Sequence, residues 1–228
     1  MKLIDTVRIG PFVYSVRYPY TFAENHDRCG QHGFDRLAIL VSDRENDSFF
    51  SDERTVVVLL HEVTHAIDTV FTGNEQLEER SIDLLAKGMF QVIKTNNLDF
   101  KSIPNKLNIM GFTMEICYPY EFEEDSETAS IHSPTSCKIL IGNSMHEKVA
   151  MYHYMIHIIT SITDILGLDE FEELDVKRFA TGFLSVFQDN PKLLELIRSD
   201  NNAIRVANSG RKNKNDRGDK RTSRSRKK

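Results

Sequence analysis

The sequence has few cysteines, and their number excludes a disulfide framework. Its 228 residues include only Cys29, Cys117 and Cys137, an odd and widely spaced set. Secreted domains that depend on disulfides carry a dense, even set of cysteines. We therefore expect a protein of the reducing cytoplasm.

Long hydrophobic runs are also missing. No run approaches the roughly 20 apolar residues that a helix needs to cross a bilayer, and residues 1 to 6 have no apolar signal core. We therefore expect a soluble, cytoplasmic protein with no membrane partner. Gly-rich phosphate loops, paired-cysteine metal motifs and serine nucleophile motifs are absent too, which excludes the enzyme classes built on them.

Charge of one sign is concentrated at the C-terminus. Residues 211 to 228 carry a net charge of +8, which leaves −13 for residues 1 to 210 out of the whole-chain −5. Because residues 210 to 228 contain no large apolar side chain, we expect a basic disordered tail. Such a tail can make weak electrostatic contact with nucleic acid, although no aromatic residues lie between its charges.

The most informative pattern that is present is His61-Glu62-Val63-Thr64-His65. Histidines four positions apart on a helix lie on one face, so both imidazoles can reach one metal ion. The glutamate after the first histidine can then act as a base toward water at the open position of the metal. This is the HExxH pattern of zinc-dependent peptidases. Because three fixed positions also recur by chance, an ordinary amphipathic helix is the alternative.

The surrounding residues predict one helix from Ser51 to Thr72. Ser51 suits the N-cap, and Gly73 suits the C-terminal stop. The Val and Leu run from 56 to 60 has strand propensity, but the apolar pattern continues to residue 71, which favours a buried helix. Two histidines and a glutamate on such a helix need partners, and a metal supplies one.

A second helix is predicted from Glu75 to Thr95, with one apolar face. A short turn at Gly73 folds it back, so a carboxylate near its start can approach the histidines. Periodicity does not choose between Glu78 and Glu79. Both glutamates could instead be solvated residues of the first turn, where the helix dipole favours acidic side chains.

These two helices resemble a known family. The HEVTH motif, the short turn and the segment from Glu79 to Val92 are similar to the small HExxH proteins common in phage genomes, which are related to ImmA/IrrE-type and SprT-like zinc metallopeptidases. The resemblance covers most of residues 7 to 97. It implies a minimal zincin of the gluzincin type, with Glu79 as the third ligand, seven residues before the small residue Ala86. For a phage-encoded protein, the resemblance implies a location in the cytoplasm of the host cell.

Strand patterns precede the helices. Residues 7 to 9 and 12 to 18 predict two strands around a Gly-Pro turn, and residues 36 to 42 predict a third strand after a polar loop from 24 to 33. We therefore predict an α+β unit, a small three-stranded sheet followed by a helical hairpin. The strand around Ile39 is a candidate to pair with an extended peptide, as edge strands do.

The same order of patterns then repeats. The Tyr-Pro-Tyr segment at 18 to 20 recurs at 118 to 120, an offset of 100, and from the first helix onward matches such as Gly73 with Gly167 lie at an offset of 94. We infer a tandem duplication. The predicted divisions are a domain at 1–98 with the HExxH motif, a degenerate copy at 99–190, a helix at 191–209 and the tail at 210–228.

The second copy lacks the motif. At the offset of 94, the two histidines and the glutamate fall on residues 155, 156 and 159, which are Met, Ile and Ile. His153 and His157 form an HxxxH pair, but they are displaced by two residues, about 200° around the helix. We expect them to be ordinary buried or surface histidines. The second copy is then an inactive partner that packs on the first as a pseudo-dimer.

Other side chains are candidates near the site. His26 and Cys29 lie in the polar loop and are candidates to line the cleft. His32 recurs as His132 in the copy without ligands, which indicates a structural role. Asp68 lies two helical turns after the first histidine and can orient a ligand imidazole, with a surface carboxylate as the alternative.

Together these patterns predict a zinc metallopeptidase. One Zn²⁺ would be held by His61, His65 and Glu79, with Glu62 as the catalytic base for hydrolysis of a peptide or protein substrate. Two alternatives stay open. One is a non-catalytic zinc scaffold or adaptor that binds a host factor, and the less favoured one is a protease of DNA-bound proteins.

Overall fold

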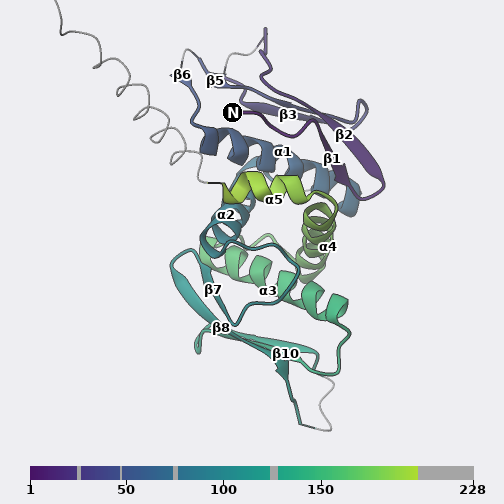
Figure 1. Ribbon diagram of the computed structural model, residues 1–228, viewed down its shortest axis with the longest axis vertical. Coiled ribbons are helices and arrows are strands. Elements are labelled where there is room, and N and C mark those ends of the chain that lie inside the picture. Colours follow the sequence, from purple (N-terminus) through teal and green to yellow (C-terminus); the bar gives the residue numbers. More distant parts are fainter. Residues whose placement is uncertain (25–26, 47, 74–76, 124–127, 200–228) are drawn as a thin grey trace, which may run out of the picture. The chain divides into compact units, whose positions relative to one another are not determined.

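A four-stranded sheet begins each half of the chain (Figure 1). The computed structural model describes residues 1–24, 27–46, 48–73, 77–123 and 128–199. The first sheet contains β1 (Thr6–Ile9), β2 (Phe12–Arg17), β3 (Gly30–Gly33) and β4 (Ala38–Val41), in the order β1-β2-β4-β3. β2 and β4 are parallel, whereas the outer strands β1 and β3 are antiparallel to their neighbours. Val7, Ile9 and Ile39 are fully buried, so one face of the sheet covers the helices.

The helical hairpin follows the sheet as predicted, and the α+β class is confirmed. α1 (Asp52–Thr72) begins where the Ser51 hydroxyl accepts a hydrogen bond from the Arg54 amide, and it ends at Gly73, which has a left-handed φ of 89°. α2 (Glu79–Asn96) starts four residues later than predicted. Its first residue is therefore Glu79, which places this carboxylate at the end of the helix nearest the turn.

The prediction of a three-stranded sheet was wrong by one strand. β3 lies inside the segment expected to be a polar loop, because its sequence, GQHG, contains no β-branched or large apolar residue. Pairing to β4 makes it a strand. β4, the strand around Ile39, therefore lies between β2 and β3, and the edge strands of the sheet are β1 and β3. A short ladder, β5 (Arg44–Glu45) with β6 (Ser48–Phe49), precedes α1.

The second half has the same order of elements. Its strands are β7 (Lys106–Ile109), β8 (Phe112–Tyr120), β9 (Ser130–Ser133) and β10 (Lys138–Gly142), arranged β7-β8-β10-β9. Its helices are α3 (Glu147–Leu166), α4 (Glu173–Asp189) and α5 (Pro191–Arg198). The remainder of the predicted final helix and the predicted basic tail lie outside the described residues.

The register between the halves differs from the one read off the sequence. All ten buried residues of α1 match the ten of α3 at an offset of 95, whereas α2 matches α4 at 94. Of the six residues missing from the second half, five are therefore lost before α3 and one between Thr163 of α3 and the start of α4. The position of Glu62 is therefore occupied by His157, and the two histidine positions by Ile156 and Thr160.

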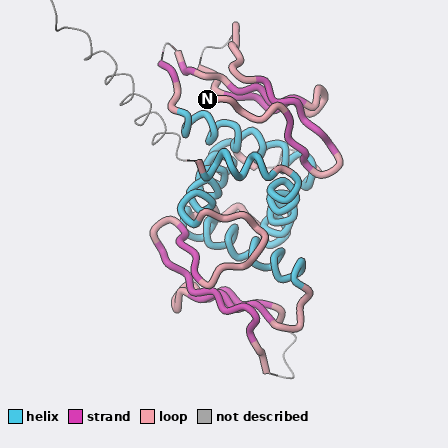
Figure 2. Tube along the Cα trace, viewed as in Figure 1, coloured by secondary structure: helices cyan, strands magenta, loops and turns pink. Residues whose placement is uncertain are grey.

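The helices of the two halves pack against each other between the sheets (Figure 2). A Cβ atom on Gly182 of α4 would meet Ile67 of α1 at 2.4 Å, and one on Gly88 of α2 would meet Ile162 of α3 at 2.5 Å. These contacts are equivalent under exchange of the halves. Residues Met1–Arg198 form one compact unit, within which the predicted boundary after Leu98 falls between α2 and β7. No helix in the described ranges is long and apolar enough to cross a membrane.

Candidate metal centre

α1 brings two imidazoles to one side of a cleft. His61 and His65 are one turn apart, and their Nε2 atoms lie 3.1 Å from each other. Both rings are partly buried, whereas Glu62, Val63 and Thr64 between them are buried. The helical repeat of α1 therefore directs residues 62–64 toward the core and leaves the two imidazole rings at the edge of the core.

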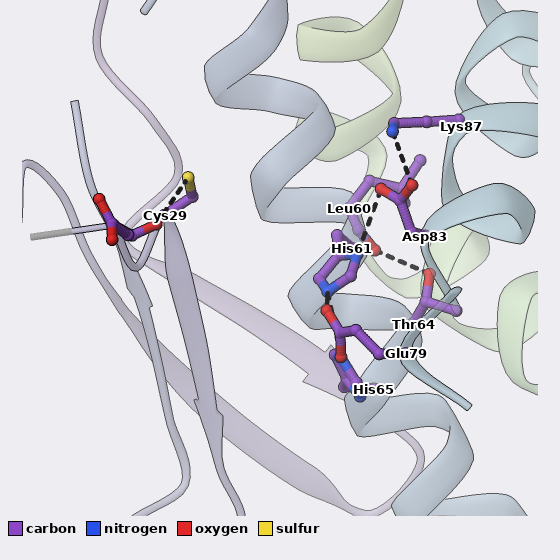
Figure 3. Close-up of polar contacts among 9 residues, drawn as sticks. Cys29, Leu60, His61, Thr64, His65, Glu79, Asp83 and Lys87 are labelled. Atoms are coloured by element: carbon purple, nitrogen blue, oxygen red, sulfur yellow. Dashed lines mark hydrogen bonds and ion pairs between the residues drawn. The ribbon is translucent and has the colours of Figure 1, made fainter. Parts of the chain in front are cut away.

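Glu79 completes a group of three. Its Oε1 lies 3.0 Å from Nε2 of His61, and its Oε2 lies 3.0 Å from Nε2 of His65 (Figure 3). Ligand atoms of a tetrahedral zinc site, with bonds of about 2.0–2.1 Å, are separated by roughly 3.3 Å. The observed spacing is close to this value, so His61, His65 and Glu79 can hold a metal ion. Within the described ranges they are the sole group of three or more His, Cys, Asp or Glu residues with convergent ligand atoms.

The structure also separates the two glutamates that periodicity left equivalent. Glu79 is the first residue of α2 and faces the histidines. Glu78 is the N-cap residue and lines a different cleft, of about 480 Å³, together with residues such as Glu170 and Arg178. Glu79 is therefore the ligand candidate.

Asp83 is a site residue that sequence reasoning missed. Its Oδ1 lies 3.8 Å from Nδ1 of His61, and its Oδ2 accepts a 2.6 Å hydrogen bond from Lys87. The signal was its place one turn after Glu79 on the same face, but acidic residues at that spacing are common on helices. Burial lowers the pKa of His61, and the positive charge of His65 adds to this effect, while Glu79 and Asp83 oppose it. A neutral imidazole is the form that binds a metal.

The side chain of Glu62 packs directly against Gly30, in the lining of the same cleft. This side chain is only 5% exposed. A Cβ atom built on Gly30 of β3 would lie 2.3 Å from Oε1 of Glu62 and 2.8 Å from its Cγ. Any residue larger than glycine at position 30 would displace the carboxylate. Gly30 is thus a second residue that the sequence did not reveal, because the side chain that requires a glycine here, that of Glu62, is distant in sequence.

His61, His65 and Glu79 line a cleft of about 670 Å³. One wall is the edge strand β3 with the residues before it, and the other is formed by α1 and the start of α2. Cys29 lies on the strand wall, apart from the histidines (Figure 3). Burial raises the pKa of its thiol, as does the nearby Glu45, whose Oε1 is 3.6 Å from the sulfur. The structure therefore places Cys29 at the cleft, while His26 lies outside the described residues.

His32 has both a structural contact and a place at the cleft. Its Nε2 lies 3.4 Å from the hydroxyl of the fully buried Tyr14. The same side chain lines the cleft. Burial, with a smaller contribution from the charge of His65, lowers the pKa of His32 to about 4. His32 is therefore neutral at pH 7.

Asp68 is not a surface carboxylate, which was one of the two alternatives for this residue. It is fully buried, and it accepts hydrogen bonds from the hydroxyl of Thr72 and from the amide of Leu77. Its carboxylate thus joins the end of α1 to the start of α2. On the Nδ1 side of His61, the nearby carboxylate is that of Asp83.

The equivalent layer of the second half contains other side chains. His157 lies beside His132 of β9, with ring centroids 5.8 Å apart. His153 shares a 2.8 Å hydrogen bond with Ser130, and Ser161 lies 3.1 Å from Nε2 of His132. His153 and His157 therefore contact the edge strand β9. Glu173, the counterpart of Glu79, pairs with Lys177 at 2.5 Å.

Comparison with known proteins adds no assignment: no family model, curated protein or solved structure matches the chain.

Proposed function

We propose that this chain is a zinc-dependent metallopeptidase whose single Zn²⁺ is held by His61, His65 and Glu79. The observation that supports this most strongly is the convergence of two Nε2 atoms and one carboxylate, with neighbouring distances of 3.0–3.1 Å. Two imidazoles and one carboxylate are the donor set of many catalytic zinc sites, which leave one coordination position open. The adjoining cleft gives that position access to a substrate.

In the proposed reaction, peptide hydrolysis depends on the zinc ion and on the carboxylate of Glu62. A catalytic zinc ion polarises the scissile carbonyl and makes water acidic enough to ionise near neutral pH. Glu62 takes the proton from the attacking water and returns it to the leaving amine. Its burial against Gly30 fixes the carboxylate before substrate arrives. Asp83, beside Nδ1 of His61, orients that ring.

An extended peptide is the substrate that suits the cleft. β3 is an edge strand and forms one wall of the cleft, so a peptide can pair with its free side while its carbonyl lies near Glu62. This assigns to β3 the role that the sequence suggested for the strand around Ile39. In a peptide that the protein cleaves, the amides can be N-methylated one at a time. Methylation at every second position should raise KM, because alternate amides of a paired strand donate hydrogen bonds to β3. Equal effects at all positions would exclude strand pairing.

The decisive variant is Glu62→Gln. It removes the base but none of the proposed ligands, so we expect one zinc per chain to remain while peptide hydrolysis falls by about 10²–10⁴-fold. Zinc is measured by elemental analysis, and hydrolysis by comparing new protein N-termini in cells that express the wild type or the variant. If zinc remains but both proteins give identical N-termini, the site is a non-catalytic zinc scaffold.

A further inference from the structure

The start of α2, which carries Glu79, lacks the cap that its counterpart has. In α4 the N-cap Glu172 and the third helical residue Asp175 form a reciprocal capping box. In α2 the N-cap Glu78 makes no side-chain cap hydrogen bond, and the third helical residue is Ser81. Ser81 therefore stands where α4 has the aspartate that closes its box.

Ser81 is instead tied to the other half of the molecule. It is buried, and its hydroxyl donates a hydrogen bond to the carboxylate of Glu170, in the connection between α3 and α4. Within its own half, the residue before the N-cap, Leu77, donates its amide hydrogen bond to Asp68 of α1. The start of α2 is thus joined to α1 through Asp68, among other contacts, and to the second half through Glu170.

This tie lies very close to the proposed metal ligand. Ser81 is two residues after Glu79, whose side chain is 73% exposed. An exposed glutamate has rotamer freedom that must be lost when it binds a metal, so a fixed backbone lowers the cost of binding. The second half also contacts α1 two residues after His65, where Ile67 packs on Gly182. Both ligand-bearing helices are therefore held by the second half next to a ligand.

We propose that Glu170 is a positioning residue for the metal site, acting through Ser81 to fix the backbone that carries Glu79. The second half, which has no such site among its described residues, thereby contributes to metal affinity in the first half. This inference rests on the proposed metal site but not on peptidase activity.

The experiment measures zinc affinity by competition with a chelator, using the full chain. Glu170→Ala should weaken zinc binding about tenfold, the lower end of the effect of residues that orient metal ligands. Glu170→Gln keeps an acceptor for Ser81 and should stay within about twofold of the wild type. In the metal-free protein, Glu170→Ala should speed hydrogen exchange at the amides of the first turn of α2.

Two further variants separate positioning from general destabilisation. Adding Ser81→Asp to Glu170→Ala recreates the arrangement of α4, so zinc affinity should recover. Glu115→Gln removes a charge from an exposed ion pair with Lys138 in the second half and should change nothing. Unchanged affinity in Glu170→Ala, or an equal loss in Glu170→Gln, would overturn the proposal. A chain that binds zinc but cleaves no peptide would refute the proposed function alone.

Discussion

At the scale of single residues, the place of Glu62 depends on the absence of a side chain at position 30. The carboxylate occupies the space that a Cβ atom on Gly30 would need. Gly30 has an ordinary backbone conformation, so the requirement for glycine here comes from this contact and not from a left-handed turn.

Gly30→Ala should therefore impair the base without removing the metal. We expect peptide hydrolysis to fall by about 100-fold, since a displacement of about 1 Å in a reacting group can have this effect. Zinc content should stay at one per chain. Gly33→Ala is the matched control, because a Cβ atom there would meet only the carbonyl oxygen of Ala38, at 3.7 Å. Full activity in Gly30→Ala would show that Glu62 is not the base.

The sequence predicted which three side chains converge, but it did not predict the residues that surround them. The shared face of His61 and His65 follows from helical spacing, the role predicted for Glu62 came from the HExxH pattern, and the choice of Glu79 came from the family resemblance. Asp83 did not stand out because acidic residues one turn apart are common on helices. Gly30 did not stand out because its contact, Glu62, is distant in sequence.

At the scale of elements, the layer between β9 and α3 should respond to acid. His157 is 6% exposed, and among the described residues its Nε2 has no hydrogen-bond partner. Burial lowers its pKa from 6.5 to about 4, and the charges of His132 and His153 add to this effect. The unfolded chain therefore binds a proton more readily than the native protein between these pH values.

This difference predicts a loss of stability in acid. The contribution of neutral His157 is fully present above pH 6.5 and is lost as the pH falls to about 4, a total of roughly 3 kcal/mol. Urea unfolding at pH 7 and pH 4.5 measures it. His157→Gln should flatten the pH dependence of the free energy of unfolding. His146→Asn, which alters an exposed N-cap histidine, should leave it unchanged; equal slopes in all three proteins would contradict the account.

Elements with a strong period were predictable, and those without one were not. Ser51, the apolar pattern and Gly73 defined α1 to within one residue. β3 has no strand propensity in its sequence and forms because β4 offers a partner. The edge strand of the candidate site was missed for this reason.

At the scale of the whole molecule, the halves meet through glycines that admit an isoleucine. Gly182 receives Ile67, and Gly88 receives Ile162. The repeat was visible in the sequence, but its register in the first helix was one residue off, because few identities lie near the deletion. The reciprocal contacts and the matched burial of α1 and α3 fix the register at 95.

Gly182→Ala should destabilise the protein, against the usual preference for alanine in helices. The preference favours alanine by about 1 kcal/mol, but a Cβ atom 2.4 Å from Ile67 requires repacking, at a cost of about 1–3 kcal/mol. We expect a net loss of up to about 2 kcal/mol in the free energy of unfolding, measured by urea denaturation. Thr181→Ala, exposed on the same helix, should change it by less than about 0.5 kcal/mol. A gain in Gly182→Ala would mean that the halves do not pack this closely.

The central claim is that one metal ion binds between α1 and the first residue of α2. It is tested most directly by native mass spectrometry of the full chain and of two neighbouring variants, Glu79→Ala and Glu78→Ala, after loading with zinc. We predict one zinc per chain in the wild type and in Glu78→Ala, and none retained by Glu79→Ala under the same conditions. Equal zinc content in the two variants, or no zinc in the wild type, would contradict the account.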